Sequence, residues 1–202
     1  YISSIKFKNL TPNFNNLIFL NYSDCSLFEI PDTLTNLIYL NCSDNNIYNL
    51  SDKFINLSFL DCSKNYITNI SNKYTKLIYL NCKNNNIKTL PDKLDHLLTL
   101  DCSVNKLRHI SYNYPQLIDL NCSYNYLNLL SNNFNLLNIL DCSHNFISEL
   151  PINFIHLISL QCYDNHLCNL PSQYINLAFL DFSFNFIFNI PNTYKLLNTL
   201  IC

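Results

Sequence analysis

The sequence predicts an α/β-type solenoid, with one parallel sheet of about ten short strands on one face and 3₁₀ or irregular turns on the other. Three observations lead to this fold class. The segment "LNCSDNNIYNL" (residues 40–50) returns every twenty residues without insertion or deletion, for example as "LDCSKNYITNI" at 60–70. Within each copy, apolar and polar residues alternate over a few positions, which is typical of a short strand with one buried face. A single copy cannot bury its apolar face alone, so neighbouring copies are expected to stack as a right-handed solenoid around a continuous core.

Each repeat begins with the predicted strand. In the copy at 37–56, Leu40 and Cys42 alternate with Tyr39 and Asn41, so we expect the first pair to face the core and the second pair to face outward. The columns that start at residues 17 and 20 hold leucine in all ten copies. Ten strands stacked about 4.8 Å apart would give a sheet about 43 Å long.

A column of asparagines follows the strands, where the chain must turn. The side-chain amide can donate to backbone carbonyls and accept from backbone N–H groups. We therefore expect a hydrogen-bonded ladder formed by Asn45, Asn65, Asn85, Asn105, Asn125, Asn145, Asn165 and Asn185. Cys25 and Ile5 replace asparagine in the first two copies, so these coils should be less regular. Because the chain has no glycine, we also expect asparagine to occupy the turn positions with positive φ.

The segment after the turn is predicted to cross the convex side. In "LPDKL" (residues 90–94), proline followed by aspartate favours the first turn of a helix. Only a few residues remain before the next strand, so we expect a single 3₁₀ or α turn there.

The repeat fits L-x-x-L-x-(L/C)-x-x-N-x-(L/I), a pattern carried by Leu37, Leu40, Cys42, Asn45 and Ile47. It closely resembles the motif of leucine-rich-repeat (LRR) proteins over nearly the whole chain. The resemblance implies a horseshoe with its sheet on the concave face, forming one domain. That domain would span residues 1–202, with an atypical first repeat at 1–16, about nine further repeats and a last repeat cut at residue 202.

The short repeat is similar to that of one LRR subclass. Twenty residues lies at the short end of the family, and "LPDKL" at 90–94 is similar to the L-P-x-x-L segment of bacterial effector proteins. The asparagine-rich composition, which matches A/T-rich codons, looks like that of repeat proteins of giant DNA viruses of amoebae, or of amoebae themselves. The start at Tyr1, without an initiator methionine or signal peptide, suggests a processed or excised piece.

Cysteine occupies an inward strand position in seven successive copies and again at the last residue: Cys42, Cys62, Cys82, Cys102, Cys122, Cys142, Cys162 and Cys202. These side chains point the same way along a line, whereas a metal site needs converging ligands. Their parallel Cβ vectors, about 4.8 Å apart, exceed the usual spacing in a disulfide. We expect small buried hydrophobic residues with reduced thiols. Reduced thiols predict a cytoplasmic location, in the host cytoplasm if the protein is viral or an effector.

The outward strand positions are the candidate partner-binding surface. Phe19, Tyr39, Phe59 and Tyr79 form an aromatic row on four successive strands. Two interpretations remain open, because the rings could stabilise the sheet by cross-strand stacking or form the hot spot of a protein-binding surface. Acidic residues on the following strands complete the candidate surface: Asp101, Asp119 and Asp141. We expect a non-catalytic module that binds a protein partner on its concave face. The alternative is the substrate-recognition domain of a larger enzyme, such as a ubiquitin-ligase effector or an F-box protein.

Composition and motifs argue against other function classes. A net charge of -2 with 13% charged residues indicates neither nucleic acid nor a membrane surface as partner. Nine of the twelve Lys and Arg residues lie between Lys53 and Arg108, and we interpret them as a solvated face interrupted by aspartates. Asp141, Ser143 and His144 are close in sequence, but no residue that would orient the histidine is evident, so a catalytic triad is not predicted. We expect no enzyme activity, no cofactor and no metal site.

The two ends of the chain are predicted to differ. The N-terminal stretch "YISSIKFKNL" (1–10) is atypical and could cap the core partially. Near the other end, Phe182 takes a cysteine position and is expected in the core. Phe184, Phe186 and Phe188 take positions that are more polar elsewhere. We expect them to leave apolar surface, so either the natural chain continues or the protein self-associates through its C-terminal end.

Overall fold

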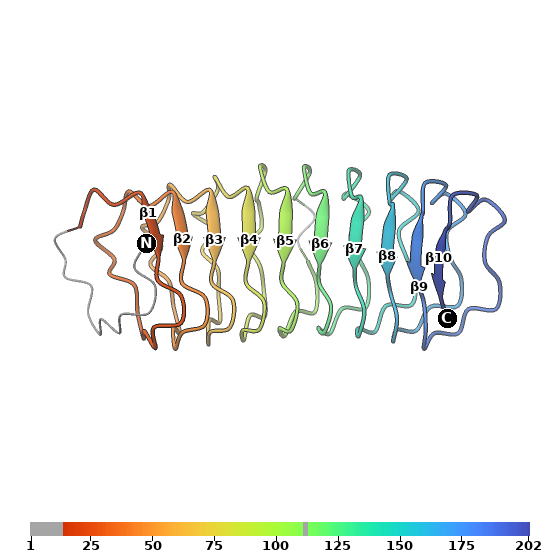
Figure 1. Cartoon of the computed structure of the whole chain (residues 1–202), viewed down its shortest axis with the longest axis horizontal. Helices are drawn as coiled ribbons and strands as arrows, with labels where there is room; N and C mark the ends of the chain where they lie inside the picture. The colour runs from red at the N-terminus through yellow and green to blue at the C-terminus, as the bar shows by residue number, and fades with distance from the viewer. Residues whose placement is uncertain (1–13, 111–112) are drawn as a thin grey trace.

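The computed structural model describes residues 14–110 and 113–202, which form ten three-residue strands in one parallel sheet (Figure 1). The strands are β1 (Phe19–Asn21), β2 (Tyr39–Asn41), β3 (Phe59–Asp61), β4 (Tyr79–Asn81), β5 (Thr99–Asp101), β6 (Asp119–Asn121), β7 (Ile139–Asp141), β8 (Ser159–Gln161), β9 (Phe179–Asp181) and β10 (Thr199–Ile201). They pair in chain order, and each residue is opposite the one twenty positions later, as Leu20 is opposite Leu40. The predicted solenoid and its single parallel sheet are confirmed.

The core lies between the sheet and the convex turns. The middle residue of each strand from β1 to β9 is buried. A second buried column on the convex side consists of Leu34, Phe54, Tyr74, Leu94, Tyr114, Phe134, Phe154, Tyr174 and Tyr194. The buried tyrosine hydroxyls have hydrogen-bond partners because they donate to carbonyls of the preceding coil. Tyr174, for example, donates to the Pro151 carbonyl at 2.6 Å. Each coil therefore buries its apolar side chains only against its neighbours.

The convex segments are successive turns. In one coil, the Phe54 N–H donates to the Ser51 carbonyl at 3.4 Å, and the Leu57 N–H donates to the Phe54 carbonyl at 3.3 Å. Both bonds span three residues, which is the spacing of a 3₁₀ turn. Residues 14–110 and 113–202 contain no helix long and apolar enough to cross a membrane.

The asparagine column joins each coil to the one before it. The Asn65 Nδ2 donates to the carbonyls of Cys42 at 3.0 Å, Cys62 at 3.1 Å and Ser63 at 3.0 Å, and its Oδ1 accepts from the Ile47 N–H at 2.9 Å. The same set of bonds recurs through the column, up to Asn185. One amide thus provides hydrogen bonds to four backbone groups of two adjacent coils.

This ladder explains why the neighbouring inward position is a cysteine. The Cys62 carbonyl accepts from the amides of both Asn65 and Asn85, so the backbone here lies close to two polar side chains. Cys42 to Cys162 in this column are almost completely buried. A small side chain fills the narrow space beside the ladder without displacing the amides.

The prediction that asparagine would occupy the positive-φ turn positions is wrong. Positive φ occurs one residue before the asparagine column, at Asp24, Asp44, Lys64, Asn84, Val104, Tyr124, His144, Asp164 and Phe184. The asparagines keep negative φ because their side chains are committed to the ladder. The preceding residue takes the left-handed conformation, and in the inner coils its N–H and carbonyl bond to the neighbouring coils. Lys64, for example, donates to the Lys83 carbonyl at 2.8 Å and accepts from Asn45 at 3.2 Å.

The two ends of the described chain depart from this pattern. The coil with Cys25 has positive φ at both Asp24 and Ser26. The predicted N-terminal cap and the coil with Ile5 lie outside the described residues. At the other end, Phe182 packs against the core but is only half-buried, as are Ile187 and Ile190 of the same coil, because only the short segment up to Cys202 is stacked on its outer side. Three aromatic residues beside it are exposed: Phe184 (83%), Phe186 (60%) and Phe188 (91%).

Candidate functional site: the concave face

The concave face is built from the first and third residues of the strands. Its most distinctive feature is the aromatic row of Phe19, Tyr39, Phe59 and Tyr79, which are paired one above the other by the strand register. Successive ring centroids are 4.1, 4.2 and 4.4 Å apart, with interplanar angles of 12°, 9° and 1°. The structure therefore brings all four predicted residues into one continuous stack across β1 to β4.

Stacking determines which parts of the rings a partner could reach. The inner ring faces cover one another, so mainly ring edges and tyrosine hydroxyls are open to solvent. Phe19 is 51% exposed, and the other three are half-buried. Burial, followed by the charges of Asp61 and Asp101, raises the pKa of Tyr79. The row thus contributes to sheet packing and also offers an apolar surface.

An acidic strip follows the aromatic row on β5, β6 and β7. Asp119 is half-buried, and burial together with the nearby charge of Asp101 raises its pKa. One Asp101 oxygen accepts from the Ser103 N–H at 3.0 Å and from its hydroxyl at 2.6 Å. Asp141 accepts from the Ser143 N–H at 3.0 Å. Asp101 and Asp141 are separated by one strand, β6, because both are in register with Asn121.

One surface beside the site was missed by the sequence analysis. The residue that precedes each strand is aliphatic and exposed in six coils: Ile18, Ile38, Ile78, Leu98, Ile118 and Ile158. At the N-terminal end of this column, a hollow of about 520 Å³ is lined by Ile18, Ile38, Ser58 and neighbouring polar residues. Its lining residues directly precede Phe19, Tyr39 and Phe59, so the apolar surface continues past the aromatic row. The signal was present in the sequence as an apolar residue that recurs every twenty positions.

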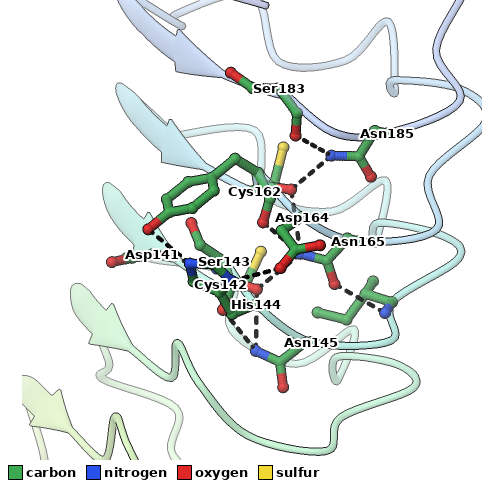
Figure 2. A network of polar contacts seen from close by, with 12 residues as sticks. Asp141, Cys142, Ser143, His144, Asn145, Cys162, Asp164, Asn165, Ser183 and Asn185 are labelled. Carbon is green, nitrogen blue, oxygen red and sulfur yellow. Dashed lines mark hydrogen bonds and ion pairs between the residues drawn. The ribbon is translucent and has the colours of Figure 1, made fainter.

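The Asp141, Ser143 and His144 combination does not form a catalytic relay (Figure 2). His144 bonds to Asp164 through Nδ1 at 2.5 Å and to the Tyr163 hydroxyl through Nε2 at 3.0 Å. Ser143 is completely buried, and its hydroxyl has no hydrogen-bond partner among the described residues. A buried hydroxyl that is not bonded to the histidine lacks the geometry of an activated nucleophile.

The cysteines are free thiols. Eight are buried, and Cys168 and Cys202 are exposed. Burial raises the pKa of Cys62, Cys82 and Cys122, with smaller contributions from neighbouring groups, so these sulfurs are poor nucleophiles. In the described part of the chain, no three His, Cys, Asp or Glu side chains are grouped to hold a metal ion.

Comparison with solved structures finds the same fold in several proteins. The functional domain of InlJ from Listeria monocytogenes, described as including a cysteine ladder, is 32% identical, with a TM-score of 0.83, over 92% of this chain and 44% of that one. YopM from Yersinia enterocolitica is 30% identical, with a TM-score of 0.83, over 95% of this chain and 42% of that one. The plant peptide hormone receptor RGFR1 in complex with RGF2 shares the fold at 22% identity, with a TM-score of 0.70, over 92% and 39%.

The matched region is only part of those proteins, because this chain spans less than half the length of each. No protein-family model matches the sequence, and comparison with the curated proteins gives no match.

Proposed function

We propose that this leucine-rich-repeat solenoid, which is similar to the LRR domains of InlJ and YopM, is an interaction module that binds a protein partner along its concave face. Proteins with this fold are typically interaction modules. One neighbour is a peptide receptor solved with its ligand, and it supports the proposal at the level of the fold alone. The module itself carries out no catalysis in this proposal.

The stacked aromatic row is the observation that carries the proposal. Four stacked aromatic side chains, one exposed and three half-buried, lie on adjacent strands next to the exposed aliphatic column that begins at Ile18. Contiguous apolar surface of this kind on a soluble domain is characteristic of a binding site. Aromatic residues are also enriched among the anchors of protein interfaces.

The acidic strip makes the two ends of the same face chemically different. The aromatic row covers β1 to β4, and the carboxylates of Asp101, Asp119 and Asp141 follow on β5 to β7. A partner segment lying across the strands would therefore place apolar side chains at one end and basic side chains at the other. Such charge complementarity would fix the orientation of the partner more than its affinity.

The test is affinity capture followed by measured binding. The intact chain would be used to capture partners from an amoebal cell extract. This extract is chosen because the asparagine-rich composition looks like that of repeat proteins of amoebae and of their giant viruses. A captured partner would then be titrated calorimetrically against wild type and a variant with Tyr39→Leu and Phe59→Leu. These changes remove the rings but keep apolar side chains, and we expect them to weaken binding by at least about 2 kcal/mol.

A matched control is available in the same column of the sheet. Phe179→Leu changes a half-buried ring of β9, outside both the aromatic row and the acidic strip of β5 to β7, and should leave binding within about 0.5 kcal/mol. If the ring variant binds like wild type while its melting temperature falls, the row only holds the sheet together and the proposed site is wrong.

The cysteine column supports a second part of the proposal, that the protein works in a reducing compartment such as the cytoplasm. Thiol titration would test it on protein isolated without reductant. We expect Cys168 and Cys202 to react in the folded protein, and all ten cysteines to react after denaturation. A count well below ten after denaturation would indicate disulfides and an oxidising compartment.

A further inference from the structure

A basic hollow lies beside the sheet, outside the concave site. It has a volume of about 640 Å³ and is lined by Lys88, Thr89, Lys106, Arg108, His109 and Tyr126. These residues follow the strands β4, β5 and β6 and belong to the part of each coil that leaves the asparagine turn. All six are exposed, so the hollow is accessible from solvent.

The cations of this hollow differ from those that pair with aspartates of a neighbouring coil. Lys53 pairs with Asp32 of the preceding coil at 2.6 Å, so opposite charges are stacked between coils. Two other pairs do the same: Lys64 with Asp44 at 3.3 Å and Lys73 with Asp52 at 2.6 Å. In the hollow, Lys88 and Arg108 lie on adjacent coils, as Lys53 and Lys73 do, but neither makes such a pair.

The cations of the hollow have no carboxylate partners in the structure. Within residues 14–110 and 113–202, Lys88, Lys106 and Arg108 make no ion pair. Three cations around one solvent-accessible hollow create a local positive potential that attracts anions. A hollow of this kind points to an anionic ligand.

We propose that this hollow binds a phosphoryl group carried on a phosphorylated segment of a partner protein. Arg108, the one arginine of the chain, can hold two phosphate oxygens with its planar guanidinium. Lys88 and Lys106 supply point charges, and the Thr89 hydroxyl is a further donor. A phosphoryl group concentrates about two negative charges on one atom cluster, which neutralises several cations better than a single carboxylate does.

The surroundings of the hollow favour a phosphoprotein over a nucleic acid. The position of Lys88 and Arg108 is occupied by Thr68 in the coil before and by Asn128 in the coil after, so the positive charge covers two coils only. Asp92 lines the adjoining hollow together with Thr89 and His109. A nucleic acid needs a track of cations along its backbone, whereas one phosphorylated side chain needs a local cluster.

The proposal is independent of the concave site, because none of the six lining residues belongs to a strand. It would remain valid if the aromatic row had no partner. It also assigns a role to part of the basic middle of the chain, which the sequence analysis had interpreted as a solvated face.

Fluorescence polarisation would test the proposal on the intact chain at physiological salt. The probes are degenerate labelled peptides with a central phosphoserine, phosphothreonine or phosphotyrosine, the same peptides without phosphate, and a labelled single-stranded RNA. We expect a phosphorylated peptide to bind, inorganic phosphate to compete, and Lys88→Gln with Arg108→Gln to weaken binding at least about tenfold. Arg108→Lys, which keeps the charge but loses the planar fork, should give an intermediate loss.

The charge-matched control is Lys53→Gln with Lys73→Gln, which removes two positive charges from the paired lysines. It should change affinity less than about twofold. Melting curves of all variants should coincide with wild type within a few degrees, because the changed side chains are exposed. The proposal is overturned if phosphorylation adds no affinity, if the control weakens binding as much as the hollow variants, or if RNA binds more tightly than every peptide.

Discussion

The central coils and the last coil contain the same hydrogen bonds but differ in burial. In the centre, Asn105 donates to the carbonyls of Cys82 and Cys102 at 2.9 and 3.1 Å and accepts from Ile87 at 2.9 Å. Asn185 in the last coil makes the equivalent bonds at 2.9, 3.0 and 2.9 Å. Yet Asn105 is buried and Asn185 is half-buried.

This difference distinguishes the structure that one coil forms by itself from the burial that its neighbouring coils provide. The turn geometry and the ladder bonds form wherever the repeat sequence is present. Burial comes from the coils stacked on both sides, as expected for a solenoid whose stability is a sum over nearest neighbours. Variants made in pairs, one in the centre and one in the last coil, measure the two contributions separately.

The largest difference is expected for a charge placed in the cysteine column. Cys102→Asp puts a carboxylate where the side chain is 1% exposed, and it should cost several kcal/mol and unfold neighbouring coils. Phe182→Asp should cost less, because that side chain is half-buried and the charge can reach water. Chemical denaturation followed by circular dichroism measures both. Equal losses would mean that the last coil is covered in solution.

The ladder amides come next. Asn105→Ala leaves the buried Ile87 N–H without a partner and should lower the free energy of unfolding by about 3 kcal/mol. Asn185→Ala removes the equivalent bonds where water can replace them and should cost about 1 kcal/mol. Hydrogen exchange at Ile87 and Leu167 would locate each effect. A larger loss at Asn185 would contradict the role given to burial.

The residues with positive φ predict a gain in stability that does not depend on the neighbouring coils. Val104 and Phe184 have φ of 56° and 52°, which is unfavourable for β-branched and bulky residues. Val104→Asn and Phe184→Asn should each stabilise the protein by about 1 kcal/mol, with the β-branched valine giving the larger gain. The reverse change, Asn84→Val, should destabilise it. A gain in the centre alone would show that packing, not the backbone, sets this effect.

The smallest effect is expected from Asp119 on the concave face. Burial and the charge of Asp101 raise its pKa, so the folded state disfavours the ionised form. The resulting loss of stability is present above the folded pKa and disappears below the unfolded pKa, near pH 3 to 4. Asp119→Asn should therefore raise the melting temperature slightly at pH 7. The gain should vanish at about pH 3 and shrink at high salt.

Features that depend on the pattern of a single repeat could be predicted from the sequence. Features that depend on how side chains of different repeats contact each other could not. The strands, the leucine columns and the position of the asparagines follow from a period that is the same in every copy. The conformation of Val104 does not, because its column holds residues as different as Asp, Lys, His and Phe, and no single residue type marks the positive φ there. The meeting of His144 with Asp164 and Tyr163 was also missed. It requires knowing that residues about twenty apart are neighbours and which way the side chains turn.

Two parts of the candidate surface show the same limit. The aromatic row was visible because its four members differ from the rest of their column. Its half-burial was not, since the rings bury one another only when stacked at 4.1 to 4.4 Å. The basic hollow was seen only as a charge run, because pairing between coils had to be known before the unpaired cations could be distinguished from the paired ones.

The asparagine ladder also has a consequence for how a gene of this kind can change length. Each junction bridged by an asparagine from Asn45 to Asn185 is closed by the same bonds, in which the amide donates to one carbonyl and accepts from one N–H of the coil before. Recombination between two repeat copies that inserts or deletes a whole multiple of one repeat therefore creates a junction identical in bonding to those already present. The length of the concave face can then vary between generations while each intermediate still folds.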